Sequence, residues 1–210
     1  MNELEVIEKS KDFLKEYFKK YGPSHDFWHI MRVYNNAIKI REQEECDTFI
    51  VKLGALFHDV GDWKYEDGGN NIIKDFLDSL KIENDIISHV INIVENISYS
   101  SSLDGDNFTS RELFIVRDAD RLDALGAIGI ARCMCYSGEK GREIYNPNIE
   151  VKLNMTKDEY KNHKSTAINH FYEKLLNLKG LMHTKTGLLM AEERHNFMNL
   201  YLEHFLDEIK

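Results

Sequence analysis

The sequence predicts an all-α protein, and three observations support this. Apolar residues recur at the spacing of one helical face, most clearly in the last segment of the chain. No stretch alternates apolar and polar residues over several successive strands. Only two prolines occur, Pro23 and Pro147, and both fall where a helix would end or a loop would turn. The last helix is expected to bury a face made of Met198, Tyr201, Leu202, Phe205 and Ile209.

The first half of the chain divides into five expected helices. Gly22-Pro23 ends the first one, because glycine favours a helix stop and proline cannot continue a helix. Asp47 has the side chain of an N-cap and is expected to start the third helix. A loop at Asp67-Gly68-Gly69-Asn70 separates that helix from the next. After the first, the expected ranges are residues 24–44, 47–59, 71–80 and 84–98.

The second half is expected to hold three longer helices. Thr109 and Glu112 form a capping box, which predicts one helix through LFIVRDADRLDALGAIGIARCMCY. Residues 137–155 are the longest irregular stretch. A second capping box, Thr156 and Glu159, predicts a helix up to about residue 179, and the final helix follows.

Composition excludes several classes of function. Hydrophobic residues make up 42% of the chain and charged residues 30%, which is typical of a globular protein. The net charge of -9 and the lack of a basic block argue against a nucleic-acid partner. No run approaches the roughly 20 apolar residues of a membrane span, so no membrane partner is expected. Because the N-terminal segment lacks a signal peptide's apolar core, we expect a cytoplasmic location.

Four polar clusters interrupt the expected helices. Each has a structural explanation, such as a helix ending, a half-buried histidine or solvated pairs with Arg117 and Arg121. Together they also contain the ligands that a divalent ion of borderline softness prefers, imidazole nitrogen and carboxylate oxygen. The clusters are His25 with His29, His58 with Asp59, His89 alone, and Asp118 with Asp120 and Asp123.

A metal site is the interpretation that joins these clusters. His29, His58, Asp59 and Asp123 would supply two nitrogens and two oxygens from separate helices. The apolar neighbours of Asp123 predict a buried position, where an unpaired carboxylate is costly. A bound ion would remove that cost.

The pattern His29 … His58-Asp59 … Asp123 resembles the HD-domain superfamily of metal-dependent phosphohydrolases. The strings HDFWHIMRV, ALFHDVGDWKY and DADRLDALGAIGIAR are similar to its bacterial branch that includes nucleoside triphosphate pyrophosphohydrolases. The tail INHFYEKLLNLKGLMHTKTG is similar too, so the resemblance covers most of the chain from Ser24 onward. It implies a single HD-domain helical bundle over residues 1–210, with a core at about 24–135 and C-terminal helices at about 156–209 packed on it.

The resemblance also implies an activity. It places a divalent ion (Mn²⁺, Fe²⁺, Ni²⁺, Co²⁺ or Mg²⁺) on the four ligands. The expected reaction is hydrolysis of a (deoxy)nucleoside triphosphate or related small nucleotide by metal-activated water. Two alternatives stay open: a nucleotide monophosphatase or phosphodiesterase using the same site, and a non-catalytic sensor that binds a nucleotide and a metal.

Several nearby residues are candidates to assist the reaction. Asp62 could orient or deprotonate the attacking water, and Lys64 could bind a phosphate oxygen. Arg132 and Lys174 could complete a phosphate clamp, although each could equally be a surface ion pair. His25 and Asp26 could support the ligand imidazoles, and His25 and His89 are also candidates to contact substrate. The apolar face of the last helix is compatible with core packing or with a homodimer surface.

Overall fold

The computed structural model describes residues 1–20, 26–60, 68–97, 108–153, 155–156, 159 and 163–210, and all regular structure within these ranges is helical. The prediction of an all-α fold is confirmed. The α-helices are α1 Glu3–Tyr17, α2 Phe27–Arg41, α3 Thr48–Phe57, α4 Gly69–Ser79, α5 Asn84–Asn96, α7 Arg111–Asp123, α8 Gly126–Glu139, α10 Ala167–Glu173 and α11 Lys185–Glu208. Two 3₁₀ helices, η1 Phe18–Lys20 and η3 Leu175–Leu181, follow α1 and α10.

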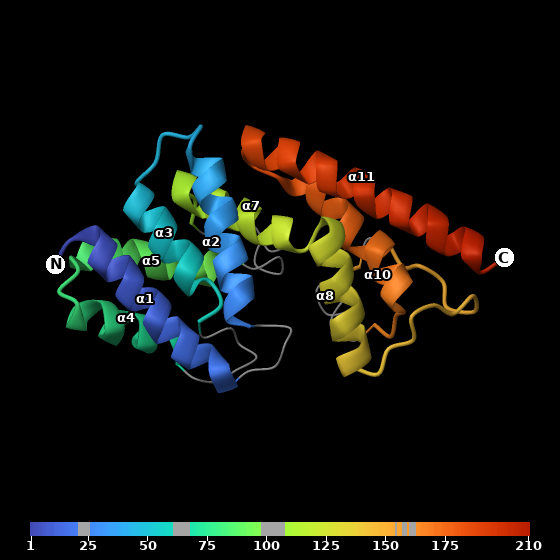
Figure 1. Cartoon of the computed structure of the whole chain (residues 1–210), viewed down its shortest axis with the longest axis horizontal. Helices are drawn as coiled ribbons and strands as arrows, with labels where there is room; N and C mark the ends of the chain where they lie inside the picture. Colours follow the sequence, from blue (N-terminus) through green and yellow to red (C-terminus); the bar gives the residue numbers. More distant parts are fainter. Residues whose placement is uncertain (21–25, 61–67, 98–107, 154, 157–158, 160–162) are drawn as a thin grey trace. The chain divides into compact units, whose positions relative to one another are not determined.

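The chain forms two compact units, Met1–Asp120 and Arg121–Lys210. In the first unit, α3 packs against α1, α2 and α5 (Figure 1). Eight of its ten residues are buried, all between Phe49 and Phe57. Gly54 allows a close approach, because a β-carbon there would lie 3.2 Å from two methyl carbons of Ile93. The helix that ends in His58 is therefore fixed on several sides.

In the second unit, α11 packs against α8 and η3 (Figure 1). Met198 and Leu202 of the predicted apolar face are buried, and Tyr201 stacks on Phe171 with ring centroids 5.8 Å apart. Ile209, at the end of that face, is exposed. The single HD domain expected over the whole chain stays a prediction.

Two helix starts differ from those expected. The second helix begins at Phe27 rather than near residue 24, because the Asp26 side chain accepts the His29 N–H and caps the helix there. At the start of α7, the Ser110 hydroxyl accepts the Leu113 N–H at 3.0 Å. The predicted capping box of Thr109 and Glu112 is therefore wrong, and Glu112 bonds other groups.

Two expected long helices are also divided. The helix predicted through DALGAIG ends at Asp123, and α8 begins at Gly126, whose φ of 70° turns the chain. In the C-terminal half, the capping contacts between Thr156 and Glu159 form. No continuous helix reaches residue 179, because Thr166 caps a new helix that starts at Ala167.

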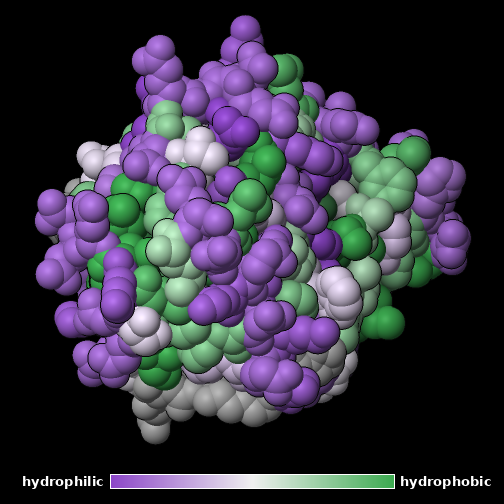
Figure 2. All heavy atoms as spheres, turned by 60° about the vertical axis from the view of Figure 1, so that its left-hand side comes forward, coloured by the Kyte–Doolittle hydropathy of each residue, from purple (hydrophilic) through white to green (hydrophobic). Residues whose placement is uncertain are grey.

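The surface is predominantly hydrophilic on the face shown in Figure 2, with hydrophobic residues scattered between polar ones. Within the described part of the chain, no helix combines the length and the apolar character needed to cross a bilayer.

Candidate metal centre

His29 lies in the first turn of α2, on the face that packs into the first unit. The Asp26 carboxylate accepts its backbone N–H at 2.8 Å, so the cap fixes where the helix starts and which way His29 points. The His29 side chain is only 3% exposed. Asp26, expected to support the ligand imidazoles, therefore acts on His29 through the backbone.

His58 and Asp59 follow the last residue of α3. The Asp47 carboxylate accepts the N–H groups of Phe49 and Ile50, which confirms it as the N-cap of this helix. His58 is the C-cap residue, and its Nδ1–H donates to the Ala55 carbonyl at 2.9 Å. This hydrogen bond fixes the tautomer, because a carbonyl can only accept, and it leaves the Nε2 lone pair free to bind.

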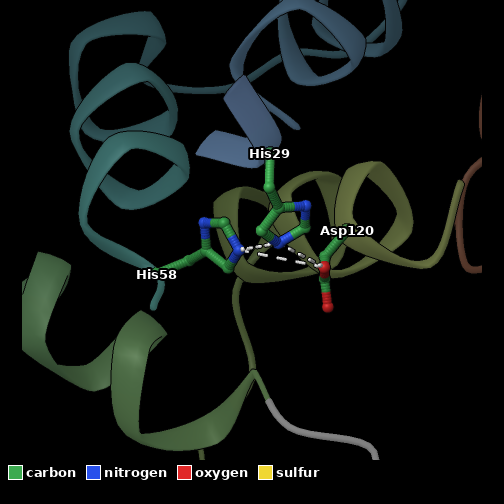
Figure 3. Close-up of side chains that lie close together, drawn as sticks. All are labelled: His29, His58 and Asp120. Carbon is green, nitrogen blue, oxygen red and sulfur yellow. Dashed lines mark hydrogen bonds and ion pairs between the residues drawn. The ribbon is translucent and has the colours of Figure 1, made fainter. Parts of the chain in front are cut away.

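Asp120 lies on the last turn of α7. Its neighbour Ala119 accepts a hydrogen bond from the buried Asn36 side chain of α2 at 3.3 Å. This contact links α2 and α7, the two helices that carry the possible metal ligands His29 and Asp120. The three side chains of His29, His58 and Asp120 point toward one another from α2, the end of α3 and α7 (Figure 3).

The ligand atoms of His29, His58 and Asp120 all lie within 4.8 Å of one another. The two Nε2 atoms are 3.1 Å apart, and Asp120 Oδ1 is 3.5 Å from His29 Nε2 and 3.8 Å from His58 Nε2. Asp59 adds Oδ2 at 3.4 Å from His29 Nε2 and Oδ1 at 3.5 Å from His58 Nε2.

These separations suit a shared ion. Ligand atoms about 2.1 Å from one ion lie roughly 3.0 to 3.4 Å apart at right-angled or tetrahedral positions. Two neutral imidazoles and two carboxylates also balance a charge of two. The imidazoles are buried, whereas the Asp120 side chain is 38% exposed. Asp120 is therefore the most solvent-accessible member of the group, and the Asp59 side chain is 15% exposed.

Asp123, expected to be the fourth ligand, has a different contact. Its carboxylate is buried, as predicted, and accepts a charged hydrogen bond from Arg132 of α8. The Arg194 guanidinium of α11 lies close enough for its charge to interact with Asp123. The cost of burying Asp123 is thus offset by arginine, and in the group of possible metal ligands the aspartate is Asp120.

Asp123 as a ligand stays a prediction, whereas Asp120 is the aspartate that the structure groups with the two histidines. Burial favoured Asp123, because a buried carboxylate needs a partner. A ligand beside a substrate must instead keep one side accessible, and Asp120 is one of the few α7 residues that is not buried. Along RDADRLD every position except Asp120 is buried.

The predicted assistants have different placements. His25, Asp62 and Lys64 lie outside the described residues. Arg132 pairs with Asp123, and Lys174 is the C-cap of α10, one helical turn after His170.

His89 belongs to a different cluster at the opposite end of α7. Its Nε2 lies 3.0 Å from Ser110 Oγ and 3.5 Å from Glu112 Oε2. Glu112 also accepts the backbone N–H of Asp47, at the start of α3. Glu112 and Asp120 are separated by about 12 Å along the helix, at 1.5 Å per residue. His89 therefore helps to hold the N-terminal ends of α3 and α7 together. These contacts do not support a contact between His89 and substrate at the metal group.

This chain is similar in sequence to a known protein family and to a known protein. The HD domain family model matches residues 27–125. YpgQ of Bacillus subtilis (strain 168) is 34% identical over 216 residues, covering 100% of this chain and 96% of its own.

Solved structures match along the whole chain. A crystal structure from Lactobacillus plantarum has a TM-score of 0.88 at 32% identity, covering 99% of this chain and 98% of its own. An HD-superfamily hydrolase from Bacillus thuringiensis has a TM-score of 0.78 at 40% identity, with the same coverage. B. subtilis YpgQ in complex with ADP has a TM-score of 0.79 at 32% identity, covering 99% and 97%.

The family-model match includes all three helices that carry the metal-binding group, and the relatives extend the similarity over the full chain. This protein therefore belongs to the HD-domain superfamily of metal-dependent phosphohydrolases.

Proposed function

We propose that this protein hydrolyses small nucleotides, cleaving within the phosphate chain of a nucleoside triphosphate. The observation that carries the proposal is the convergence of His29, His58 and Asp120 within 4.8 Å, with Asp120 partly exposed. Two imidazole nitrogens 3.1 Å apart with a carboxylate oxygen 3.5 and 3.8 Å from them match the spacing of ligands around one divalent ion.

Four residues hold the ion in this proposal: His29, His58, Asp59 and Asp120. The Ala55 carbonyl keeps His58 in the tautomer whose Nε2 is free to bind. A bound divalent ion supplies Lewis acidity, which polarises phosphoryl oxygens and acidifies water. The mixed nitrogen and oxygen set suits Mn²⁺, Fe²⁺, Co²⁺ or Ni²⁺, and less well Mg²⁺, which favours oxygen ligands.

Asp62 and Lys64 are proposed to act on the substrate side. Both follow the His58-Asp59 pair closely in sequence. A carboxylate three residues after Asp59 in the sequence suits a group that accepts a proton from water. A lysine ammonium suits a phosphate oxygen.

The nucleotide as substrate is supported by a relative. B. subtilis YpgQ has been crystallised with ADP, and its structure matches 99% of the length of this chain. A diphosphate nucleotide offers both phosphoryl oxygens for a metal and an organic part for the surrounding protein.

The reaction is tested by identifying products. The purified protein is loaded with Mn²⁺ and incubated with ribo- and deoxyribonucleoside tri-, di- and monophosphates. The proposal expects triphosphates to be cleaved, with pyrophosphate or phosphate released. Release of phosphate from monophosphates alone would identify a monophosphatase, and binding without turnover for every metal and nucleotide would identify a sensor.

The site is tested with a matched pair of variants. Asp120→Asn removes a ligand charge and is expected to lower bound metal and to reduce turnover by about 10- to 100-fold or more, since disturbing the groups around a metal typically costs that much. Asp78→Asn removes an equally exposed carboxylate, which pairs with Lys74 on α4, and is expected to keep both. An Asp120→Asn protein with full metal content would show that the ligand assignment is wrong.

A further inference from the structure

Trp28 is unusual among the described residues because its large aromatic side chain is 66% exposed. Tryptophan is highly buried on average, since its ring gains much from leaving water. The exposed indole lies in the first turn of α2, between Phe27 and the metal-binding candidate His29. An apolar ring in water beside a metal-binding group requires an explanation.

Helix geometry places the indole near the same end of α2 as the His29 imidazole. Side chains on an α-helix tilt toward its N-terminus, and successive residues point about 100° apart. Trp28 and His29 therefore both project past the start of α2, on adjacent sides. His29 points into the first unit, whereas Trp28 remains in solvent.

Phe27 restrains the indole. The two ring centroids lie 5.7 Å apart with the planes inclined at 62°, an edge-type contact. A ring held in this way loses little conformational freedom when a flat ligand binds it.

We propose that Trp28 is the platform on which the nucleotide base stacks while the phosphates lie at the metal group. This inference rests on the proposed function, and it concerns the base rather than the reacting phosphate. Every base has a π-face, so a stacking platform accepts all of them with only modest preferences. The protein is therefore expected to discriminate weakly between bases, and the phosphate chain is expected to decide which substrates are cleaved.

Fluorescence can report on Trp28 directly. The sequence holds two tryptophans, so Trp63→Phe leaves Trp28 as the only emitter. ADP and pyrophosphate are titrated into this variant with Mn²⁺ present, and binding is followed in parallel by calorimetry. ADP is expected to quench or shift the emission, whereas pyrophosphate, which has no base, is expected to bind without this change. Equal changes with both ligands, or no change although ADP binds, would overturn the platform.

Affinity provides the second readout. Trp28→Ala is expected to raise the Kd for ADP by about five- to 150-fold, the usual range for loss of one base–aromatic stack, with the Kd for pyrophosphate unchanged. Trp28→Phe keeps a smaller ring and is expected to recover part of the loss. Phe197→Ala removes another exposed aromatic ring, on α11, and is expected to change neither constant.

The outcomes separate this inference from the proposed function. If Trp28→Ala binds ADP as well as the unaltered protein does, the platform is wrong while the metal site and the reaction stand. If it weakens pyrophosphate equally, Trp28 supports the metal group and not the base. If the unaltered protein binds neither ligand with Mn²⁺, both proposals fail.

Discussion

Two aspartates three residues apart on α7 have opposite surroundings. Asp123 is 1% exposed and paired with Arg132, whereas the Asp120 side chain is 38% exposed and faces two imidazoles. The negative charge of Asp123 is balanced by the arginine cation. Asp120 lies instead beside two imidazole nitrogens, which are suited to binding an ion together with it. The first arrangement stabilises the fold, and the second suits the metal-binding role proposed for Asp120.

Removing Arg132 is expected to destabilise the protein through Asp123. Arg132→Met leaves a buried carboxylate without its main cation, which costs about 2 kcal/mol or more even though Arg132 is partly exposed. Urea unfolding measures this loss. The double variant Arg132→Met with Asp123→Asn no longer buries a charge and is expected to recover most of the stability. If Asp123 is not a metal ligand, the single variant and the double variant both keep their metal content. A double variant that contains no metal would show that Asp123 is a ligand.

His170 links stability to pH. Burial, together with the charges of Lys174 and Arg142, lowers the pKa of His170 to about 3. In the unfolded chain this pKa returns to about 6.5, so between these values the unfolded state binds more protons. The stability linked to His170 is therefore complete above pH 6.5 and falls on acidification, by up to about 1.4 kcal/mol per pH unit.

The measurement is urea unfolding at pH 7, 5.5 and 4.5. His170→Gln removes the titrating group and is expected to lose less stability on acidification than the unaltered protein. His204→Gln, at an exposed position of α11, is the control and is expected to follow the unaltered protein. Parallel curves for all three proteins would show that His170 is not buried in its neutral form.

At the scale of elements, the start of α8 depends on one glycine that has no space for a side chain. A β-carbon at Gly129 would lie 2.2 Å from the Ala124 carbonyl oxygen. Gly126, three residues earlier, has a φ of 70° and therefore turns the chain between α7 and α8. The two glycines make the corner that separates these helices.

Gly129→Ala is expected to destabilise the protein by about 1–3 kcal/mol, because the backbone itself must move to admit the methyl group. Gly138→Ala is the matched control in the same helix, where a β-carbon meets nothing within 4 Å. That change is expected to be neutral or stabilising by up to about 1 kcal/mol, since alanine favours a helix. Equal unfolding free energies for the two variants would contradict a close packing at Gly129.

Helix position was predictable where a polar cap or a loop signal stood at the boundary. Asp47 begins α3 as expected, and α4 and α5 lie within two residues of their expected ranges. The break between α7 and α8 was not predictable from periodicity, because the apolar pattern continues across it. The extended backbone of Leu125 and the left-handed backbone of Gly126 separate the two helices, and neither can be read from the residue type alone.

For the whole molecule, the sequence predicted the all-α class and two of the three residues that the structure groups as possible metal ligands, His29 and His58. His58 could be found because it stands beside a second metal-competent residue, Asp59, at the end of an apolar helix, and Asp59 as a ligand stays a prediction. His29 could be found from its place in HDFWHIMRV. Choosing Asp120 over Asp123 required three-dimensional information, since the Arg132 that compensates Asp123 comes from the following helix.

Metal binding is expected to stabilise the whole fold. An ion that binds only the folded state at 100 times its Kd adds about 2.7 kcal/mol. For a chain of this size the melting temperature should rise by about 5–10 °C. Calorimetric scans with Mn²⁺ and with excess chelator measure the difference. The Asp120→Asn variant serves as control, and a full rise in that variant would place the stabilising ion elsewhere.

The contacts of Glu112 link the N-terminal ends of α3 and α7. Glu112 holds the first N–H of the α3 cap at Asp47, and His89 joins it to Ser110, the cap of α7. From this junction α7 runs about 12 Å from Glu112 to Asp120, and α3 runs about 16 Å from Asp47 to His58, so each helix sets a fixed distance to its proposed ligand. One residue inserted into either helix would turn its ligand by about 100° and advance it by about 1.5 Å. Insertions and deletions should therefore be tolerated in the connection before Asp47, but not inside α3 or α7.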